Sequence, residues 1–479
     1  MRILRTLVPY VAGAALFSVA VGASRLHQTV PVVTPSPKGT ATENGLAGYA
    51  KILFSAVFVS GRTPEDGAQG SAYFFMPAAE RDKVTWKVDR EAKLVRASLG
   101  TITREARFHG DQGCIIENPD KPGIHFTPVA VKTTLPDAMT QAWPMGDRPD
   151  TSPLPAGVDR NKLDAAVDAA FSDPAAQTAA FLVVYKGRIV AERYKDGITK
   201  DTQLESWSMG KSLAATLFAL LVKDGTYTLE QPAPVSLWRY PADPRGAIRN
   251  IDLLRMSSGL KFVGNQEGST AEVLDHYYIY TGGIDAFWYS ITRPPEFPPN
   301  TRGFYRNCDP LTITYLVKQA VMNRGDNILT WPQRMLFDKI GIRRQVLETD
   351  PHGNFLITGY DYGTARNWAR LGMLYLQDGM WQGQRLLPEG WSKFVSTPAP
   401  AWTRPEYGAF FWLNGVGNWN LPAETYLAAG AGGQNTWIVP SRDLVIVRMG
   451  HMRGQGAARK ITNAALGLVM EAIGAKAER

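Results

Sequence analysis

The stretch ESWSMGKSLAATLFALLVKDG, residues 205 to 225, constrains the fold more than any other part of the chain. If a helix begins near Ser208, leucines, alanines and Phe218 surround it with apolar side chains on nearly every face. Such a helix is stable in water only when other elements cover it all round. The pattern predicts a central helix in a large core, which a chain of 479 residues with 44% hydrophobic residues can build.

A serine and a lysine stand where this helix begins. Lys211 follows Ser208 by one helical turn, so both side chains share a face and the ammonium can reach the hydroxyl. Burial and the helix N-terminus both disfavour a charged lysine, so we expect its pKa to fall until it can accept the serine proton. The pair predicts a nucleophile activated without histidine. The alternative is an ordinary helix start, with serine as cap and lysine reaching solvent.

The S-x-x-K spacing alone is weakly specific, since Ser258 and Lys261 match it within what the following glycine marks as a loop. A second pattern adds weight: Tyr305 and Asn307 leave a proline- and glycine-rich loop just before a helical segment. A tyrosine beside a lysine of low pKa can pass the serine proton to a leaving group, and an asparagine amide can bind both lysine and substrate. The alternative is a capping loop with a core tyrosine.

Four segments in one order carry a family resemblance: Ser208-x-x-Lys211, LLRMSSGL (253–260), Tyr305-x-Asn307 and GAGGQNTWIVPSRDLVIV (430–447). Together they resemble the serine β-lactamase and penicillin-binding-protein superfamily, and most of all its class C-like hydrolases, which include esterases and 6-aminohexanoate-dimer hydrolase. The resemblance covers residues 155–475. It implies that Ser208 is the acylated nucleophile, Lys211 its base or proton partner and Tyr305 a general base and acid. It also implies an oxyanion hole from the Ser208 amide and one amide on a later strand.

The third motif of that family departs from its usual Lys-Thr-Gly or His-x-Gly, because this chain has Ala428-Ala429-Gly430 at that point. The missing cation normally holds a substrate carboxylate, a contact worth about 1.5–3 kcal/mol. Penicillin and D-alanyl-D-alanine substrates are therefore disfavoured. Glycines 430, 432 and 433 still permit close approach of substrate to the backbone and an oxyanion-hole amide. Gln434 is either a further substrate contact or a plain surface residue.

The remaining pattern predicts an α/β (α+β) fold, with a mostly antiparallel sheet flanked by helices and an inserted helical subdomain. The resemblance implies that this fold is β-lactamase-like. Strands are expected at both ends of the 155–475 domain, including a hairpin about Lys186 and Gly187. Residues 142–157 are turn-rich and mark a boundary. Before them lies an N-terminal section, 45–150, of unknown role, with short strands expected at 71–75, 83–88 and 94–100.

The first 23 residues place two arginines before an apolar run, which predicts an export signal that is either cleaved or kept as a membrane anchor. Residues 24–44 are rich in proline, threonine and serine and are expected to form an exposed linker. The protein is therefore expected in the periplasm or on the outer face of the cytoplasmic membrane. Its net charge of +8 contains no block of like charges, which argues against nucleic-acid recognition.

No cofactor is expected, because neither the six histidines nor the two cysteines have metal-ligand spacing. Cys114 and Cys308 are either two buried thiols or one disulfide. An aromatic segment, 275–297, is either a lid that favours apolar acyl groups or subdomain core.

The leading hypothesis is an exported serine hydrolase that cleaves a small-molecule ester or amide. Its rivals are a D,D-peptidase or β-lactamase, and a non-catalytic envelope protein that keeps the fold as a binding module.

Overall fold

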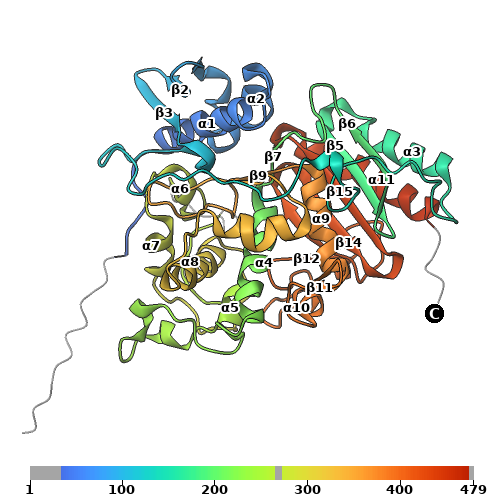
Figure 1. Ribbon diagram of the computed structural model, residues 1–479. Coiled ribbons are helices and arrows are strands. Elements are labelled where there is room, and N and C mark those ends of the chain that lie inside the picture. Colours follow the sequence, from blue (N-terminus) through green and yellow to red (C-terminus); the bar gives the residue numbers. More distant parts are fainter. Residues whose placement is uncertain (1–33, 265–271, 474–479) are drawn as a thin grey trace, which may run out of the picture. The chain divides into compact units, whose positions relative to one another are not determined.

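The computed structural model describes residues 34–264 and 272–473, all within one compact unit that begins at Thr34 (Figure 1). The expected export signal, residues 1–23, lies outside the described residues. Helix α1 (Ala41–Phe58) starts inside the segment expected to be linker. The reason is a capping box: the Thr40 hydroxyl accepts from the Glu43 amide, and the Glu43 carboxylate accepts from the Thr40 amide.

The main sheet has six strands, antiparallel throughout, as expected. Their spatial order is β12 (Trp412–Leu413), β13 (Tyr426–Gly430), β14 (Gln434–Val439), β15 (Leu444–Gly450), β5 (Thr178–Tyr185) and β6 (Arg188–Tyr194). The hairpin expected about Lys186 and Gly187 joins β5 to β6, and both turn residues have positive φ, 49° and 75°. The first strand of the domain thus pairs with the last, so its two ends meet in the middle of the sheet.

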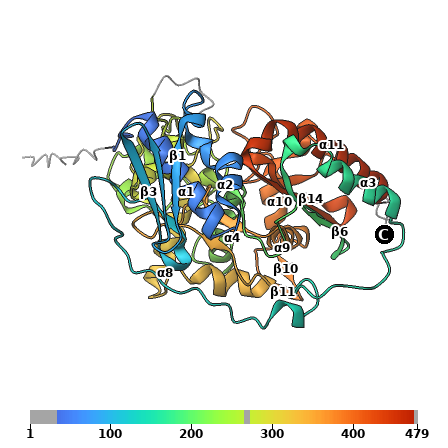
Figure 2. The same cartoon turned by 90° about the horizontal axis from the view of Figure 1, so that it is seen from above.

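Helices cover both faces of this sheet (Figures 1 and 2). On one face, α3 (Arg160–Phe171) and α11 (Gln455–Ala472) pack together over β5, β14 and β15. On the other, α9 (Ala365–Leu376) lies against β14 and β15. Strand β5 contributes side chains to the cores on both faces, because Phe181 and Val183 join the α3–α11 core whereas Leu182 and Val184 join the larger core.

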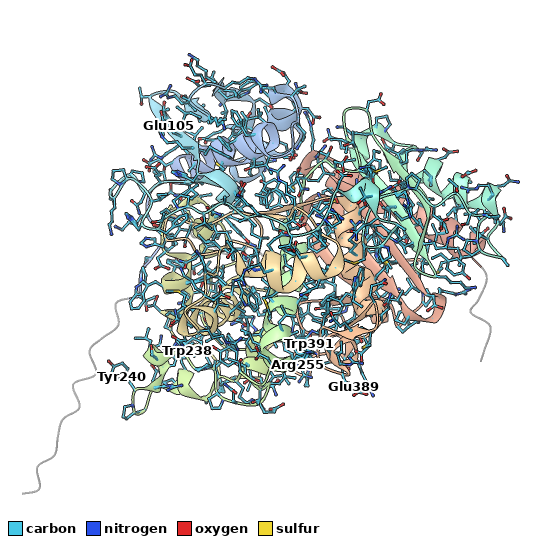
Figure 3. All side chains as sticks on the ribbon, viewed as in Figure 1. Glu105, Trp238, Tyr240, Arg255, Glu389 and Trp391 are labelled. Carbon is cyan, nitrogen blue, oxygen red and sulfur yellow. The ribbon has the colours of Figure 1, made fainter. Side chains whose placement is uncertain are left out.

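The inserted helical subdomain lies between β6 and β12. Its helices are α4 (Gly210–Lys223), α5 (Asn250–Leu254), α6 (Asp275–Thr281), α7 (Ala286–Ile291), α8 (Cys308–Asn323) and α10 (Trp391–Ser396). Short strands β7 (Leu204–Glu205), β9 (Asp361–Gly363) and β8 (Val346–Leu347) form a small sheet, and β10 (Met380–Trp381) pairs with β11 (Gln384–Arg385). At the edge of the subdomain Trp238 is buried while Tyr240 is exposed (Figure 3).

The N-terminal section packs α1 and α2 (Pro64–Gly70) with a four-stranded antiparallel sheet. The sheet contains β1 (Thr85–Asp89), β2 (Leu94–Leu99), β3 (Ile102–Phe108) and β4 (Cys114–Ile115), and Glu105 on β3 forms ion pairs with Arg96 and Arg107 (Figure 3). The strands expected at 83–88 and 94–100 are present. The strand expected at 71–75 is wrong: Ala72–Phe75 form a 3₁₀ turn, η1, which buries Ala72 and Phe75 on one side.

The two cysteines are buried free thiols, so the disulfide alternative is not realised. Across residues 34–264 and 272–473, no helix has both the length and the apolar character that crossing a bilayer requires. In the same ranges, no three acidic, histidine or cysteine side chains gather in a way that could hold a metal ion.

Candidate active site

Ser208 stands in a tight turn between β7 and α4. A 3₁₀ turn, Trp207–Met209, precedes α4, and Trp207 has φ +49°, a left-handed conformation that non-glycine residues seldom adopt. Gly210 follows, and a Cβ there would lie 1.7 Å from the Ile357 carbonyl oxygen. The turn buries Trp207 and Met209 but leaves Ser208 partly exposed. The local backbone thus presents the serine hydroxyl at the surface of the core.

Lys211 meets Ser208 as its spacing predicts. The lysine Nζ donates to Ser208 Oγ at 2.9 Å and to the Thr358 carbonyl oxygen at 3.1 Å, and the side chain is 1% exposed. Burial lowers the pKa of Lys211 well below its ordinary value, although nearby Asp361 opposes the shift. Burial also raises the pKa of the Asp361 carboxyl to about 8. The Asp361 carboxyl is therefore mostly neutral near pH 7, and the lowered pKa makes Lys211 a readier proton acceptor than an exposed lysine.

Tyr305 completes the group, from the loop that leads into α8. Lys211 Nζ lies 4.8 Å from the centroid of the tyrosine ring, which stacks on Trp412 at 5.4 Å. Burial raises the pKa of Tyr305, and a hydrogen bond with Ser208 only partly offsets that rise. The phenol is therefore protonated at neutral pH, while the pKa of the neighbouring amine is shifted towards its neutral form. The two pKa shifts suit Lys211 to a base and Tyr305 to an acid.

Asn307 lies close to this group but its bonds differ from the prediction. Its side chain is fully buried, and Nδ2 donates to the main-chain carbonyl of His276 at 3.3 Å. Its Oδ1 has no partner in the described ranges, and no bond to Lys211 is present there. Because Oδ1 is itself buried, the substrate contact expected of Asn307 stays a prediction.

Gly430 ends β13 directly beside the nucleophile. A Cβ at this position would lie 2.3 Å from the Ser206 carbonyl oxygen and 3.0 Å from the Ser208 nitrogen. Only glycine lets the strand come this close to the Ser208 amide. The oxyanion hole expected from this amide and one on a later strand stays a prediction.

Gly432 and Gly433 shape the turn that follows β13. Both have positive φ, 78° and 75°, and both carbonyls accept from Arg448 Nη1, at 2.8 and 3.0 Å. A Cβ on Gly433 would lie 2.5 Å from that guanidinium nitrogen. Arg448 is fully buried, and burial lowers its pKa to about 10. These glycines therefore make room for a buried guanidinium that fixes the turn, whereas Gly430 is the one that meets the nucleophile turn.

Neither prediction made for Gln434, substrate contact or surface residue, holds. The side chain is buried, and its amide donates to the Gly450 carbonyl oxygen at 2.5 Å and accepts from the Gly450 amide at 2.9 Å. The paired register of β14 and β15 ends at Asn435 and Arg448, and Gln434 stands just beyond it. Its buried side chain bonds to the main chain at the end of this strand pair.

Three residues near the site carried no usable signal in the sequence. Thr358 contributes only a main-chain carbonyl, which no motif records. Asp361 precedes α9 and reads as part of a helix start. His276 belongs to the aromatic 275–297 segment, and its ring centroid lies 6.2 Å from that of Tyr305. Most aromatics of that segment are core, as Tyr278, Tyr280, Phe287 and Tyr289 are buried, but His276 and Tyr277 are partly exposed beside the site.

Comparisons with known proteins give the family and the fold of this chain. The family model described as Beta-lactamase matches residues 163–469. A 6-aminohexanoate-dimer hydrolase from Paenarthrobacter ureafaciens is 24% identical over 294 residues, covering 57% of this chain and 72% of that protein.

Two solved structures are similar in fold. A penicillin-binding protein homologue from Caulobacter crescentus has a TM-score of 0.50 and 17% identity, covering 65% of this chain and 99% of its own. A simvastatin synthase from Aspergillus terreus has a TM-score of 0.50 and 15% identity, and the match covers 66% of this chain and 98% of that protein.

Proposed function

The chain belongs to the β-lactamase family of serine hydrolases, and on that premise we propose that it cleaves an ester or amide through an acyl-enzyme at Ser208. The observation that carries the proposal is the bond of 2.9 Å between Ser208 Oγ and the buried Lys211 Nζ. An amine of lowered pKa at hydrogen-bond distance from a partly exposed hydroxyl is the geometry of an activated nucleophile.

The proposed reaction moves one proton from serine to the leaving group. Lys211 accepts the Ser208 proton as Oγ bonds to the substrate carbonyl carbon, and the Ser208 amide with an amide at the end of β13 stabilises the oxyanion. As the tetrahedral adduct collapses, Tyr305 protonates the departing oxygen or nitrogen and recovers a proton from Lys211. Water then attacks the acyl-enzyme by the reverse of these transfers and releases the acid.

The substrate class follows from what faces the nucleophile. Strand β13, Tyr426–Gly430, carries no cation, so a substrate carboxylate has no partner on the strand that holds it in the wider family. This favours an ester or amide without a carboxylate near the scissile bond over a penicillin or a D-alanyl peptide. The Paenarthrobacter relative is named for hydrolysing a 6-aminohexanoate dimer, and we carry over only the ester or amide class.

Intact-mass spectrometry after reaction with a fluorophosphonate, in parallel with a penicillin, tests the proposal. We expect a fluorophosphonate adduct on the native chain that Ser208→Ala abolishes, and no penicillin adduct. A penicillin adduct at Ser208 would replace the proposal with a peptidase or β-lactamase activity. Absence of both adducts would instead support a non-catalytic binding protein.

We also propose that the catalytic part acts outside the cytoplasm, in the periplasm or anchored at the membrane. The support is the basic and apolar pattern of residues 1–23. N-terminal sequencing of the mature protein from a membrane and a soluble fraction distinguishes cleavage after this segment from its retention.

A further inference from the structure

We propose that the N-terminal section supplies Phe74 to a subsite for an apolar group that flanks the scissile bond. The inference rests on the proposed function and names the substrate chemistry beside Ser208. It also gives the N-terminal section a direct part in substrate selection.

The first step is that η1 is fastened to the strand that leads into the nucleophile. Ser71, just before η1, donates to Glu205 Oε1 at 2.5 Å, and Arg62 Nη1 lies 3.2 Å from the same oxygen. Glu205 is buried on β7, three residues before Ser208. Burial alone would raise the pKa of Glu205, but Arg62 and His451 outweigh it and lower the pKa to about 2. The carboxylate is therefore charged and holds η1 in place at any working pH.

The second step is that α1 fixes the orientation of the turn. A Cβ on Gly48 of α1 would lie 2.3 Å from the Phe75 ring, so glycine there makes room for Phe75 to seat against the helix. Phe75 is buried, whereas its neighbour Phe74 remains partly exposed. With Phe75 packed against α1, the preceding side chain, Phe74, is left at the surface beside the nucleophile turn.

The third step is that Phe74 begins a series of ring contacts that ends at the catalytic group. Its ring meets Trp207, the residue before Ser208, edge-on at 4.7 Å, and Tyr277 at 5.8 Å. Tyr277 contacts His276 at 5.7 Å, and His276 contacts Tyr305 at 6.2 Å. Apart from buried Trp207, every ring in the series is partly exposed, as is Ser208. These rings make an aromatic wall between η1 and the reacting serine.

The chemistry of the wall defines its ligand. Aromatic rings bind apolar and aromatic groups by dispersion and edge contacts. Burial lowers the pKa of His276 to about 3, with Lys211 adding to the shift, so this ring is neutral. The wall therefore offers no charge to a carboxylate. It fits an alkyl or phenyl group on the acyl or the leaving side of the bond.

Two series of esters measured on the full chain test the subsite. One varies the acyl group with a fixed p-nitrophenyl leaving group, from acetate to phenylacetate; the other varies the alcohol of an acetate, from ethyl to benzyl. We expect Phe74→Ala to reduce the preference in kcat/KM for the larger group by roughly tenfold in one series. Hydrolysis of the smallest ester should stay within about twofold, and the affected series identifies the side of the bond.

The matched control is Tyr73→Ala. Tyr73 lies in the same turn, is partly exposed and has its ring over Arg81, 4.9 Å from the guanidinium carbon. The Tyr73→Ala variant should keep the native preference in kcat/KM for larger esters in both series. Equal losses for large and small esters in Phe74→Ala, or unchanged preferences in both series, overturn the subsite.

Fluorophosphonate labelling of Ser208 separates this inference from the proposed function. A native chain that forms no adduct overturns both. Normal labelling with unchanged preferences in the Phe74 variant overturns the subsite alone. If Phe74→Ala does not fold or label, Phe74→Trp decides: its larger ring should narrow the subsite and reject the bulkiest esters, and unchanged preferences would refute the assignment.

Discussion

Replacing Lys211 with methionine removes the proposed base while keeping a side chain of similar length. Within residues 34–264 and 272–473, the only other group bonded to the serine that could take its proton is Tyr305, whose pKa burial raises above its ordinary value of about 10. At pH 7 at most about one tyrosine in a thousand is then ionised. The variant should react with a fluorophosphonate at least about 10³-fold more slowly, an increase of roughly 4 kcal/mol in activation free energy.

The pH dependence gives a second readout of the same substitution. Because the pKa of Lys211 is lowered well below its ordinary value, the native labelling rate should reach a plateau well below pH 10. In Lys211→Met the residual rate should instead rise about tenfold per pH unit towards alkaline pH, as tyrosine ionises. A labelling rate within tenfold of the native one, or a residual rate that does not change with pH, would refute this assignment of the base.

Stability and a control variant separate this effect from misfolding. Methionine avoids the burial of an amine but removes the closer of two donors to the Thr358 carbonyl, leaving Ser208 Oγ at 3.5 Å. The free energy of unfolding should therefore change by less than about 3 kcal/mol. Lys318→Met is the matched control, because Lys318 is a partly buried lysine that bonds to the His352 carbonyl and the Asn354 side chain. The Lys318→Met variant should react with the fluorophosphonate at the native rate.

Three further outcomes are expected. Gly430→Ala places a methyl group 2.3 Å from the Ser206 carbonyl oxygen and should slow labelling at least about a hundredfold, while Gly456→Ala, in open space on α11, should not. The pKa of Glu205 is lowered to about 2 in the folded state, so its stabilising charge is complete above about pH 4.5 and is lost as the pH falls from there towards 2. Urea unfolding across that range should show the free energy of unfolding falling with pH. The fall should be smaller in Glu205→Gln. Residues 155–479 expressed alone should fail to give the cooperative thermal unfolding of the full chain, and a cooperative transition would contradict the coupling described below.

The parts of the site that sequence could predict are those set by local spacing. Ser208 and Lys211 sit one helical turn apart, and a helix fixes that geometry whatever surrounds it. Gly430 could be predicted for a similar reason, since a glycine at a strand end indicates close backbone approach. Tyr305 could be predicted from its position just before a helix and from the order of the four family segments. The antiparallel sheet followed from alternating strands at the two ends of the catalytic domain.

The errors arise where tertiary pairing decides the outcome. Gln434 bonds to Gly450, sixteen residues further along the chain, and only the folding of β14 beside β15 brings the two residues together. Residues 71–75 are apolar and aromatic, a composition that fits a strand as well as a buried turn. Their 3₁₀ geometry depends on Gly48, from a helix more than twenty residues earlier. Sequence spacing holds no record of either contact.

The N-terminal section shares buried charges with the catalytic domain, and this argues against its being a separable support. Arg62 pairs with Glu205, and Lys51 of α1 pairs with Glu348, with all four side chains at most 3% exposed. Removing one partner of a buried pair leaves a charge in the core without compensation, which costs about 3–5 kcal/mol. Loss of the whole section would remove both cations at once and open the two glutamates to water, one of them three residues from the nucleophile. We therefore expect the nucleophile turn to lose its fixed shape when the N-terminal section is absent.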